Sequence, residues 1–185
     1  MIARLLRDKG VFEYVAAARK VKLDYPGACF QLLGAVDTAN RTAIDAATVT
    51  LWEREGIINY LGTTDDVRPY IAAAHCVVLP SYREGAPRTL IEAAAMARPL
   101  IATDVPGCRS VVDDGKTGYL CKVRDSDDLA RCIETFLVLP HTKKSRMGCA
   151  GRKKMAKSFD QAIVAQAYRD ALHFISLDEK QRVVQ

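Results

Sequence analysis

Two carboxylates with a defined spacing are the first residues in this sequence that suggest chemistry. Glu84 and Glu92 are separated by seven residues. With Glu84 in a loop and Glu92 one to two turns into the following helix, one carboxylate reaches the mouth of the helix and the other reaches further along its side. Carboxylate oxygens accept hydrogen bonds from the hydroxyls of a neutral polyol. The spacing is equally compatible with a surface ion pair between Arg88 and Glu92 at i,i+4, with Glu84 merely solvated.

The residues between the two carboxylates are typical of a loop that meets a ligand. Gly85 lets the backbone approach a ligand closely. Pro87 is expected at the first position of the helix, where its missing N–H costs nothing. The free amides near Arg88 and Thr89 form an anion site. The loop follows a buried strand, so we expect it at the carboxyl end of a parallel sheet, where ligands bind in open α/β folds.

The elements that must position this loop follow from the hydrophobic pattern. Short apolar runs alternate with longer amphipathic ones, which is typical of βαβ units around a parallel sheet, and we predict an α/β fold. The short runs lack a polar alternation, as strands buried on both faces do. The expected strands are residues 1–6, 29–33, 57–61, 76–80, 99–103 and 118–121. The expected helices are residues 11–22, 43–55, 67–74, 87–97 and 127–138, with two more between 140 and about 176.

The composition is that of a globular domain. The 185 residues are 49% hydrophobic and 26% charged, which excludes a disordered chain, a collagen and a coiled-coil rod. No segment has the roughly 20 uncharged apolar residues of a membrane span, and no apolar signal core follows the first charged residues, so we expect a cytoplasmic chain. The six cysteines form no CxxC pair. We therefore expect free, mostly buried thiols rather than a metal site or disulfides.

The net charge of +5 is concentrated near the C-terminus. Residues 143–157 contain seven bases and no acid. Such a patch faces anionic lipid headgroups or nucleic acid, or it is only a solvated helix face. No aromatic residues are interleaved to stack on bases, so we expect no nucleic-acid partner.

A resemblance to a known family adds to this interpretation. Residues 78–97, with Glu84 and Glu92 in an E-x7-E arrangement, resemble the donor-binding C-terminal domain of retaining glycosyltransferases of the GT-B fold, glycosyltransferase family 4. Residues 3–10 look like that family's first strand and its Arg-x4-Lys-Gly loop. Further motifs occur in the family's order, at residues 32–34, 60–62, 99–107 and 114–118.

The resemblance implies a Rossmann-like parallel sheet flanked by helices that forms one half of a GT-B architecture. Residues 1–176 are then a nucleotide-sugar-binding domain, and residues 177–185 are a frayed tail. Arg4 and Lys9 are expected to hold the donor diphosphate, which gains negative charge when the glycosidic bond breaks.

In the family, the second glutamate of the motif holds the ribose hydroxyls and the first approaches the transferred sugar. This makes Glu92 a donor-binding residue and Glu84 the catalytic one. The other implied donor contacts are Gly85, Ala86, Pro87, Arg88 and Thr89, with Gly62 and Thr63 beside the base.

The implied activity is that of a hexosyltransferase of EC 2.4 type that is part of a longer protein. It would transfer sugar, with retention, from a UDP-sugar to a polysaccharide or a lipid-linked oligosaccharide. Since the acceptor-binding N-terminal domain is absent from these residues, we expect donor binding but poor transfer. With such an acceptor, the basic patch would lie beside the anionic inner face of the membrane. Two positions depart from the family pattern: Ala97 stands where glycine is usual, and Ser110 where glutamate is common.

Other functions fit the sequence less well. A nicotinamide oxidoreductase would need a G-x-G-x-x-G loop, which the sequence lacks, and nothing in the sequence indicates the flanking acid pair of a glycosidase. Asp125-Ser126-Asp127 matches a D-x-D metal motif, but it precedes a helix, so we expect a cap and no metal or other cofactor. Asp65 or one of its neighbours, Thr64 and Asp66, is expected to cap the helix of residues 67–74. A non-catalytic nucleotide-binding or interaction module remains the alternative function.

Overall fold

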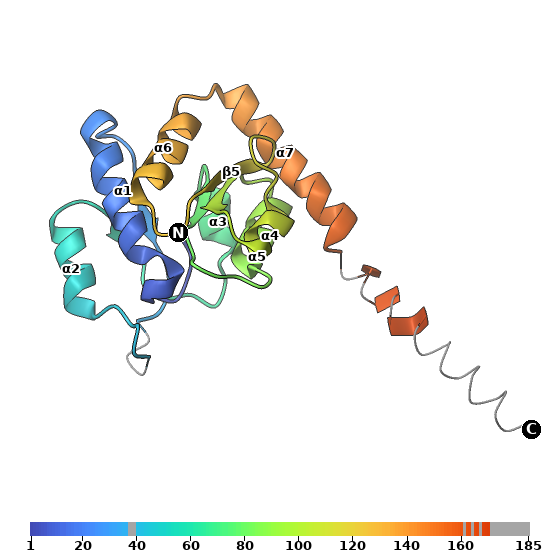
Figure 1. The fold of residues 1–185 in the computed structure, drawn as a ribbon, viewed down its shortest axis with the longest axis horizontal. Helices are drawn as coiled ribbons and strands as arrows, with labels where there is room; N and C mark the ends of the chain where they lie inside the picture. Colours follow the sequence, from blue (N-terminus) through green and yellow to red (C-terminus); the bar gives the residue numbers. More distant parts are fainter. Residues whose placement is uncertain (37–39, 161, 164, 167, 171–185) are drawn as a thin grey trace, which may run out of the picture.

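The computed structural model describes residues 1–36, 40–160, 162–163, 165–166 and 168–170, which form an α/β fold (Figure 1). The strands are β1 (Gln31–Leu32), β2 (Asn59–Tyr60), β3 (Val77–Leu79), β4 (Leu100–Thr103) and β5 (Gly118–Cys121). They form two parallel sheets, with the orders β1-β2 and β3-β4-β5. Each lies within a predicted strand, and every residue of β3 and β4 is buried, as the missing polar alternation indicates.

The helices lie on both sides of these strands. They are α1 (Val11–Asp24), α2 (Ala46–Arg54), α3 (Arg68–Ala73), α4 (Arg88–Ala95), α5 (Pro106–Val111), α6 (Ser126–Leu137) and α7 (His141–Ser158), with a short 3-10 helix, η1 (Arg7–Lys9). Figure 1 shows α1 beside α6 on one side, and α4 beside α7 on the other. Among the described residues, no helix combines the length and the apolar character needed to cross a bilayer.

The N-terminal segment differs from its prediction. Residues 1–6 run parallel to β1, and the N–H of Ala3 donates to the carbonyl of Leu33 (3.0 Å), but only isolated bridges form instead of a regular strand. The chain turns early, because the N–H of Leu6 donates to the carbonyl of Arg4 (2.8 Å) and η1 follows at once. Gly34 permits the close approach, since a Cβ there would lie 1.7 Å from the carbonyl oxygen of Ala3.

Two local predictions at helix ends need correction. Pro87 is the residue before α4 rather than its first residue. The N-cap of α3 is Val67, which makes no side-chain cap; Asp66 instead accepts a hydrogen bond from the N–H of Arg68 (3.0 Å). For α6, the sequence predicts a cap from Asp125 or Ser126, and Asp125 is the one that forms it.

The C-terminal predictions are tested only in part. α7 ends at Ser158, and residues 162–163, 165–166 and 168–170 are helical. The tail predicted at residues 177–185 lies outside the described residues, as does the end of the domain near residue 176. All six cysteines are free; Cys108, Cys121 and Cys132 are buried, whereas Cys29 and Cys149 are exposed.

The backbone conformation at Ala97 accounts for the glycine that is usual at this position. Ala97 follows the C-cap of α4 with a φ of 56°. The N–H of Arg98 donates to the carbonyl of Ala93, and that of Ala97 donates to the carbonyl of Ala94 (both 2.9 Å), which is a Schellman motif. An alanine in this left-handed conformation is strained.

We predict that Ala97→Gly stabilises the fold by about 1 kcal/mol, because glycine adopts a positive φ without strain. The control is Ala156→Gly, at an exposed position inside α7, which should cost about 1 kcal/mol. Urea denaturation measures both. Destabilisation by Ala97→Gly would contradict the assignment of strain.

Candidate active site

The loop that carries Glu84 is joined to the loop after the N-terminal segment. The carbonyl of Asp8 accepts hydrogen bonds from the N–H of Tyr82 (2.8 Å) and from the buried hydroxyl of Ser81 (3.2 Å). A Cβ at Gly10 would lie 2.0 Å from the carbonyl oxygen of Pro80. The two loops therefore pack backbone against backbone, one after β3 and the other after the N-terminal segment.

This junction brings together two of the predicted site residues. Lys9 Nζ donates to Glu84 Oε1 over 2.6 Å, and the two side chains are 23% and 11% exposed. Lys9 and Glu84 are 75 positions apart in the chain. An ammonium and a carboxylate thus share one partly buried position.

Helix α5 closes the other side of the Glu84 loop. A Cβ at Gly107 would lie 2.3 Å from the carbonyl oxygen of Glu84 and 2.5 Å from that of Gly85, so only glycine fits there. Burial, together with the charge of Glu84, raises the pKa of the Cys108 thiol to about 12, so this neighbour stays neutral. Ser110, the second departure from the family pattern, donates from its hydroxyl to the carbonyl of Gly107 (2.7 Å).

Of the predicted residues on α4, Arg88 and Glu92 face solvent, whereas Thr89 makes a structural contact. Arg88 forms the i,i+4 ion pair with Glu92 over 3.6 Å, with side chains 89% and 39% exposed, so the pair is weak and Glu92 stays accessible. Thr89 donates from its hydroxyl to the carbonyl of Ile2 (3.3 Å), which ties α4 to the N-terminal segment. The first amides of α4 point along the helix axis with no partner one turn earlier in the helix.

The remaining predicted residues lie at the same edge of the strands as the pair. Gly62 and Thr63 follow β2, and the carbonyl of Gly62 accepts from the N–H of Gly34 (2.8 Å). Gly85 and Ala86 are exposed in the loop before α4, and Arg4 is exposed beside β1. In the described part of the chain, no hydrogen bond or ion pair joins Gly62 or Thr63 to Lys9 or Glu84.

A family model described as Glycosyl transferases group 1 matches residues 1–138. This chain belongs to that family. A similar curated protein is the N,N'-diacetylbacillosaminyl-diphospho-undecaprenol alpha-1,3-N-acetylgalactosaminyltransferase of Campylobacter jejuni, 30% identical over 91% of this chain and 42% of the relative. Another is the lipopolysaccharide core biosynthesis glycosyltransferase LpsE of Rhizobium meliloti, 25% identical over 92% of this chain and 48% of the relative.

Solved structures agree on the fold. HepE of Anabaena in complex with UDP has a TM-score of 0.83 at 22% identity, covering 93% of this chain and 47% of that one. Sucrose-phosphate synthase of Thermosynechococcus elongatus has a TM-score of 0.80 at 26% identity, covering 95% and 44%. The chain spans less than half the length of these relatives. The neighbours are GT-B glycosyltransferases, so the predicted Rossmann-like half of a GT-B architecture is confirmed.

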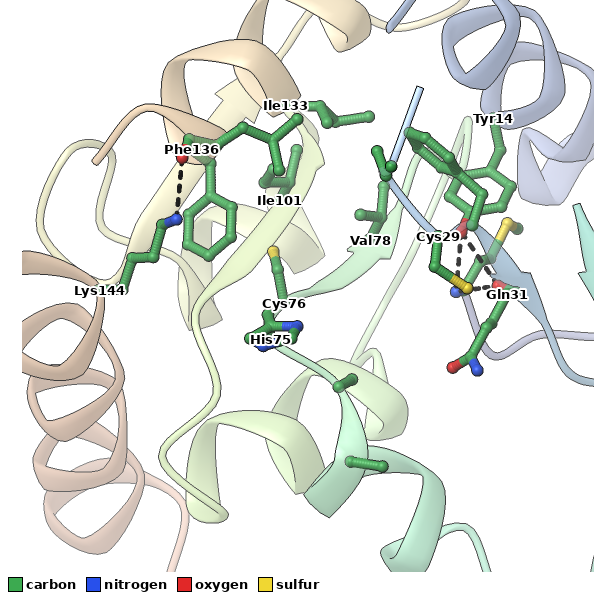
Figure 2. A pocket seen from close by; sticks show the side chains of 17 residues that line it. Tyr14, Cys29, Gln31, His75, Cys76, Val78, Ile101, Ile133, Phe136 and Lys144 are labelled. Atoms are coloured by element: carbon green, nitrogen blue, oxygen red, sulfur yellow. Dashed lines mark hydrogen bonds between the residues drawn. The ribbon is translucent and has the colours of Figure 1, made fainter. Parts of the chain in front are cut away.

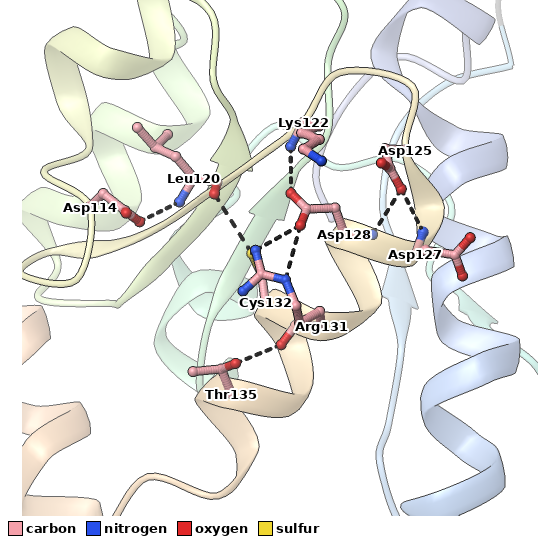
Figure 3. Close-up of polar contacts among 9 residues, drawn as sticks. All are labelled: Asp114, Leu120, Lys122, Asp125, Asp127, Asp128, Arg131, Cys132 and Thr135. Carbon is pink, nitrogen blue, oxygen red and sulfur yellow. Dashed lines mark hydrogen bonds and ion pairs between the residues drawn. The ribbon is translucent and has the colours of Figure 1, made fainter.

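In this member of the group 1 family, the aspartates of the D-x-D sequence support α6 (Figure 3). Asp125 accepts hydrogen bonds from the N–H groups of Asp127 (3.1 Å) and Asp128 (2.9 Å). Asp127 pairs with Lys20 on α1, and Asp128 accepts from the N–H of Lys122 (2.8 Å). The described residues contain no cluster of three or more metal-ligating side chains. These carboxylates are therefore used for capping and for ion pairs.

Residues that support the junction were missed by the sequence analysis. Tyr82 donates from its hydroxyl to Glu13 Oε1 on α1 (2.7 Å), and the Arg124 guanidinium lies 4.6 Å from the Tyr82 ring centre. Burial raises the pKa of Tyr82, and its bond to Glu13 raises it further. The hydroxyl of Thr103, at the end of β4, donates to the carbonyl of Ser81. No motif indicates these contacts, because each joins residues distant in the chain.

A cavity of about 490 Å³ lies at the opposite edge of the strands (Figure 2). Its lining includes His75 and Cys76 just before β3, Gln31 of β1, and Phe136 and Lys144. Burial raises the pKa of Cys76 to about 12. The cavity contains none of the predicted donor-binding residues, so it is separate from the candidate active site.

Proposed function

We propose that this chain is the donor-binding half of a retaining glycosyltransferase of family 4 that uses a UDP-sugar. The observation that carries the proposal is the junction of the loop after β3 with the loop after the N-terminal segment, where Lys9 meets Glu84 near the start of α4. The family membership and the names of two relatives support it. One solved neighbour is a complex with UDP, and one curated relative is named as a transferase for a diphospho-undecaprenol-linked substrate.

The proposed roles follow from charge and position. Lys9 and Arg4 bind the diphosphate, whose negative charge grows as the glycosidic bond breaks, and the first amides of α4, at Arg88 and Thr89, add dipoles of the right sign. Glu92, which is accessible on α4, accepts hydrogen bonds from the ribose hydroxyls. Glu84 faces the transferred sugar.

The other proposed contacts to the donor are made by the backbone of two loops. Gly85, Ala86 and Pro87 let the loop come close to the donor, and Gly62 and Thr63 hold the base. The Lys9 ammonium and the amides supply the positive charge without a metal. The acceptor is a polysaccharide or a lipid-linked oligosaccharide, and transfer needs the acceptor-binding half found in full-length proteins of this kind, so this chain alone transfers poorly.

Calorimetric titration with UDP, ADP, GDP and NAD tests this function. We expect selective binding of UDP, weakened at least about tenfold in Glu92→Ala because the ribose loses its acceptor. Glu134→Ala, which removes a half-buried glutamate from α6, is the matched control and should bind UDP as the wild type does.

Two results would contradict the proposal. Equal affinity of wild type and Glu92→Ala for UDP would remove the role of Glu92. No binding of any nucleotide would leave a scaffold or an interaction module, which is the alternative function.

We also propose that the chain works in the cytoplasm at the anionic inner face of a membrane. Two of the seven bases predicted as a patch turn inward: Lys144 Nζ donates to the carbonyl of Leu137 (2.9 Å), and Lys154 pairs with Asp113 (2.6 Å). The other five are exposed on α7: Lys143, Arg146, Arg152, Lys153 and Lys157. Apart from Arg152, they share one helix face.

Vesicle co-sedimentation tests this surface. Each base near an anionic surface contributes about 1 kcal/mol, so replacing Arg146, Lys153 and Lys157 by Ala should weaken binding to phosphatidylglycerol vesicles roughly a hundredfold. Replacing Arg41, Arg54 and Lys116, which are exposed elsewhere, removes the same charge and should have a much smaller effect. Binding that does not depend on anionic lipid would exclude the surface.

A further inference from the structure

We propose that Glu84 and a nucleoside diphosphate compete for the ammonium of Lys9, so that Glu84 lowers the affinity of the site for the free diphosphate. This inference rests on the proposed function, since it assumes that Lys9 binds phosphate. It concerns what the carboxylate does to binding, separately from any contact that it makes with a sugar.

The first support is the geometry of the pair. Lys9 Nζ lies 2.6 Å from Glu84 Oε1, a short charge-assisted hydrogen bond. Glu84 is only 11% exposed, so water screens the attraction weakly. Without a ligand, the Lys9 ammonium that we expect to bind phosphate is therefore already paired with the Glu84 carboxylate.

The second support is the rigidity of the surrounding backbone. Tyr82 and Ser81 both donate to the carbonyl of Asp8, next to Lys9. On the other side, Gly107 packs directly against the carbonyls of Glu84 and Gly85. Since these contacts hold both loops near each other, the most direct way to separate the pair is rotation of the two side chains.

The Lys9 ammonium can bind a phosphate in two ways, and Glu84 weakens phosphate binding in both. If the ammonium shares its three donors between Glu84 and a phosphate, the carboxylate stays close to a second negative group and repels it. If the ammonium turns fully to the phosphate, Glu84 is left partly buried without its cation. Glu84 thus favours release of a diphosphate product.

A positioning role for Glu84 predicts the opposite change in UDP affinity. If Glu84 served to hold Lys9 in place for the phosphate, its neutralisation would weaken diphosphate binding. The sign of the change in UDP affinity therefore separates competition from positioning.

The experiment is calorimetric titration of UDP into the wild-type chain, Glu84→Gln, Lys9→Met and the double variant, with thermal unfolding as a check of folding. We expect Glu84→Gln to bind UDP about tenfold more tightly than the wild type, as coupling of close charge pairs allows, and Lys9→Met to bind it more weakly. In the Lys9→Met background, Glu84→Gln should raise the affinity less than it does in the wild type, because the competition for Lys9 is gone and only the direct repulsion between carboxylate and phosphate remains.

Asp104→Asn is the charge control. Asp104 is exposed at the end of β4, at the same edge, and pairs with Arg109. Its neutralisation should change UDP affinity less than about twofold, as expected for a screened surface charge.

The outcomes separate the competition for Lys9 from the proposed donor binding. UDP binding by the wild type, with equal or weaker binding by folded Glu84→Gln, overturns the competition alone. An equal gain in Asp104→Asn also overturns it, because the effect would then be one of net charge. No UDP binding by any variant overturns the proposed function and this inference with it.

Discussion

The carbonyl oxygen of Asp8 accepts two hydrogen bonds from the loop after β3, and the candidate site depends on this junction. The donors are the N–H of Tyr82 and the fully buried hydroxyl of Ser81. A hydrogen bond of this kind contributes about 0.5 to 1.5 kcal/mol, so both contacts favour the packed arrangement of the two loops. Lys9 and Glu84 meet because their neighbours in the chain are held in this way.

Close backbone packing makes the junction compact. Gly10 and Gly107 each stand where any side chain would overlap a carbonyl group, at Pro80 and at Glu84 respectively. The loop that carries Glu84 is thus held between the start of α1 and the start of α5. Parallel strands bring the predicted base-binding residues to the same edge, while the large cavity opens at the opposite edge. The chemistry and the cavity are therefore separate features of this fold.

The sequence predicted most of the elements, because their signals are local. Buried apolar runs predicted β3 and β4, and Asp125 predicted the start of α6. Helix α5 was not predicted from the sequence, although Pro106 at its first position is a helix-start signal. Residues 1–6 form no regular strand, because the chain turns at Arg4 and enters η1. The contact between Lys9 and Glu84 and the support from Tyr82, Glu13 and Thr103 are tertiary. No spacing in the sequence encodes them, whereas the i,i+4 pair of Arg88 and Glu92 could be read directly.

The most direct test of the account is a crystal structure of this chain with UDP. We expect the diphosphate within hydrogen-bond distance of Lys9 Nζ, beside the first amides of α4, with the ribose hydroxyls on Glu92. UDP seated in the cavity beside His75 and Phe136, or a diphosphate remote from Lys9, would contradict it.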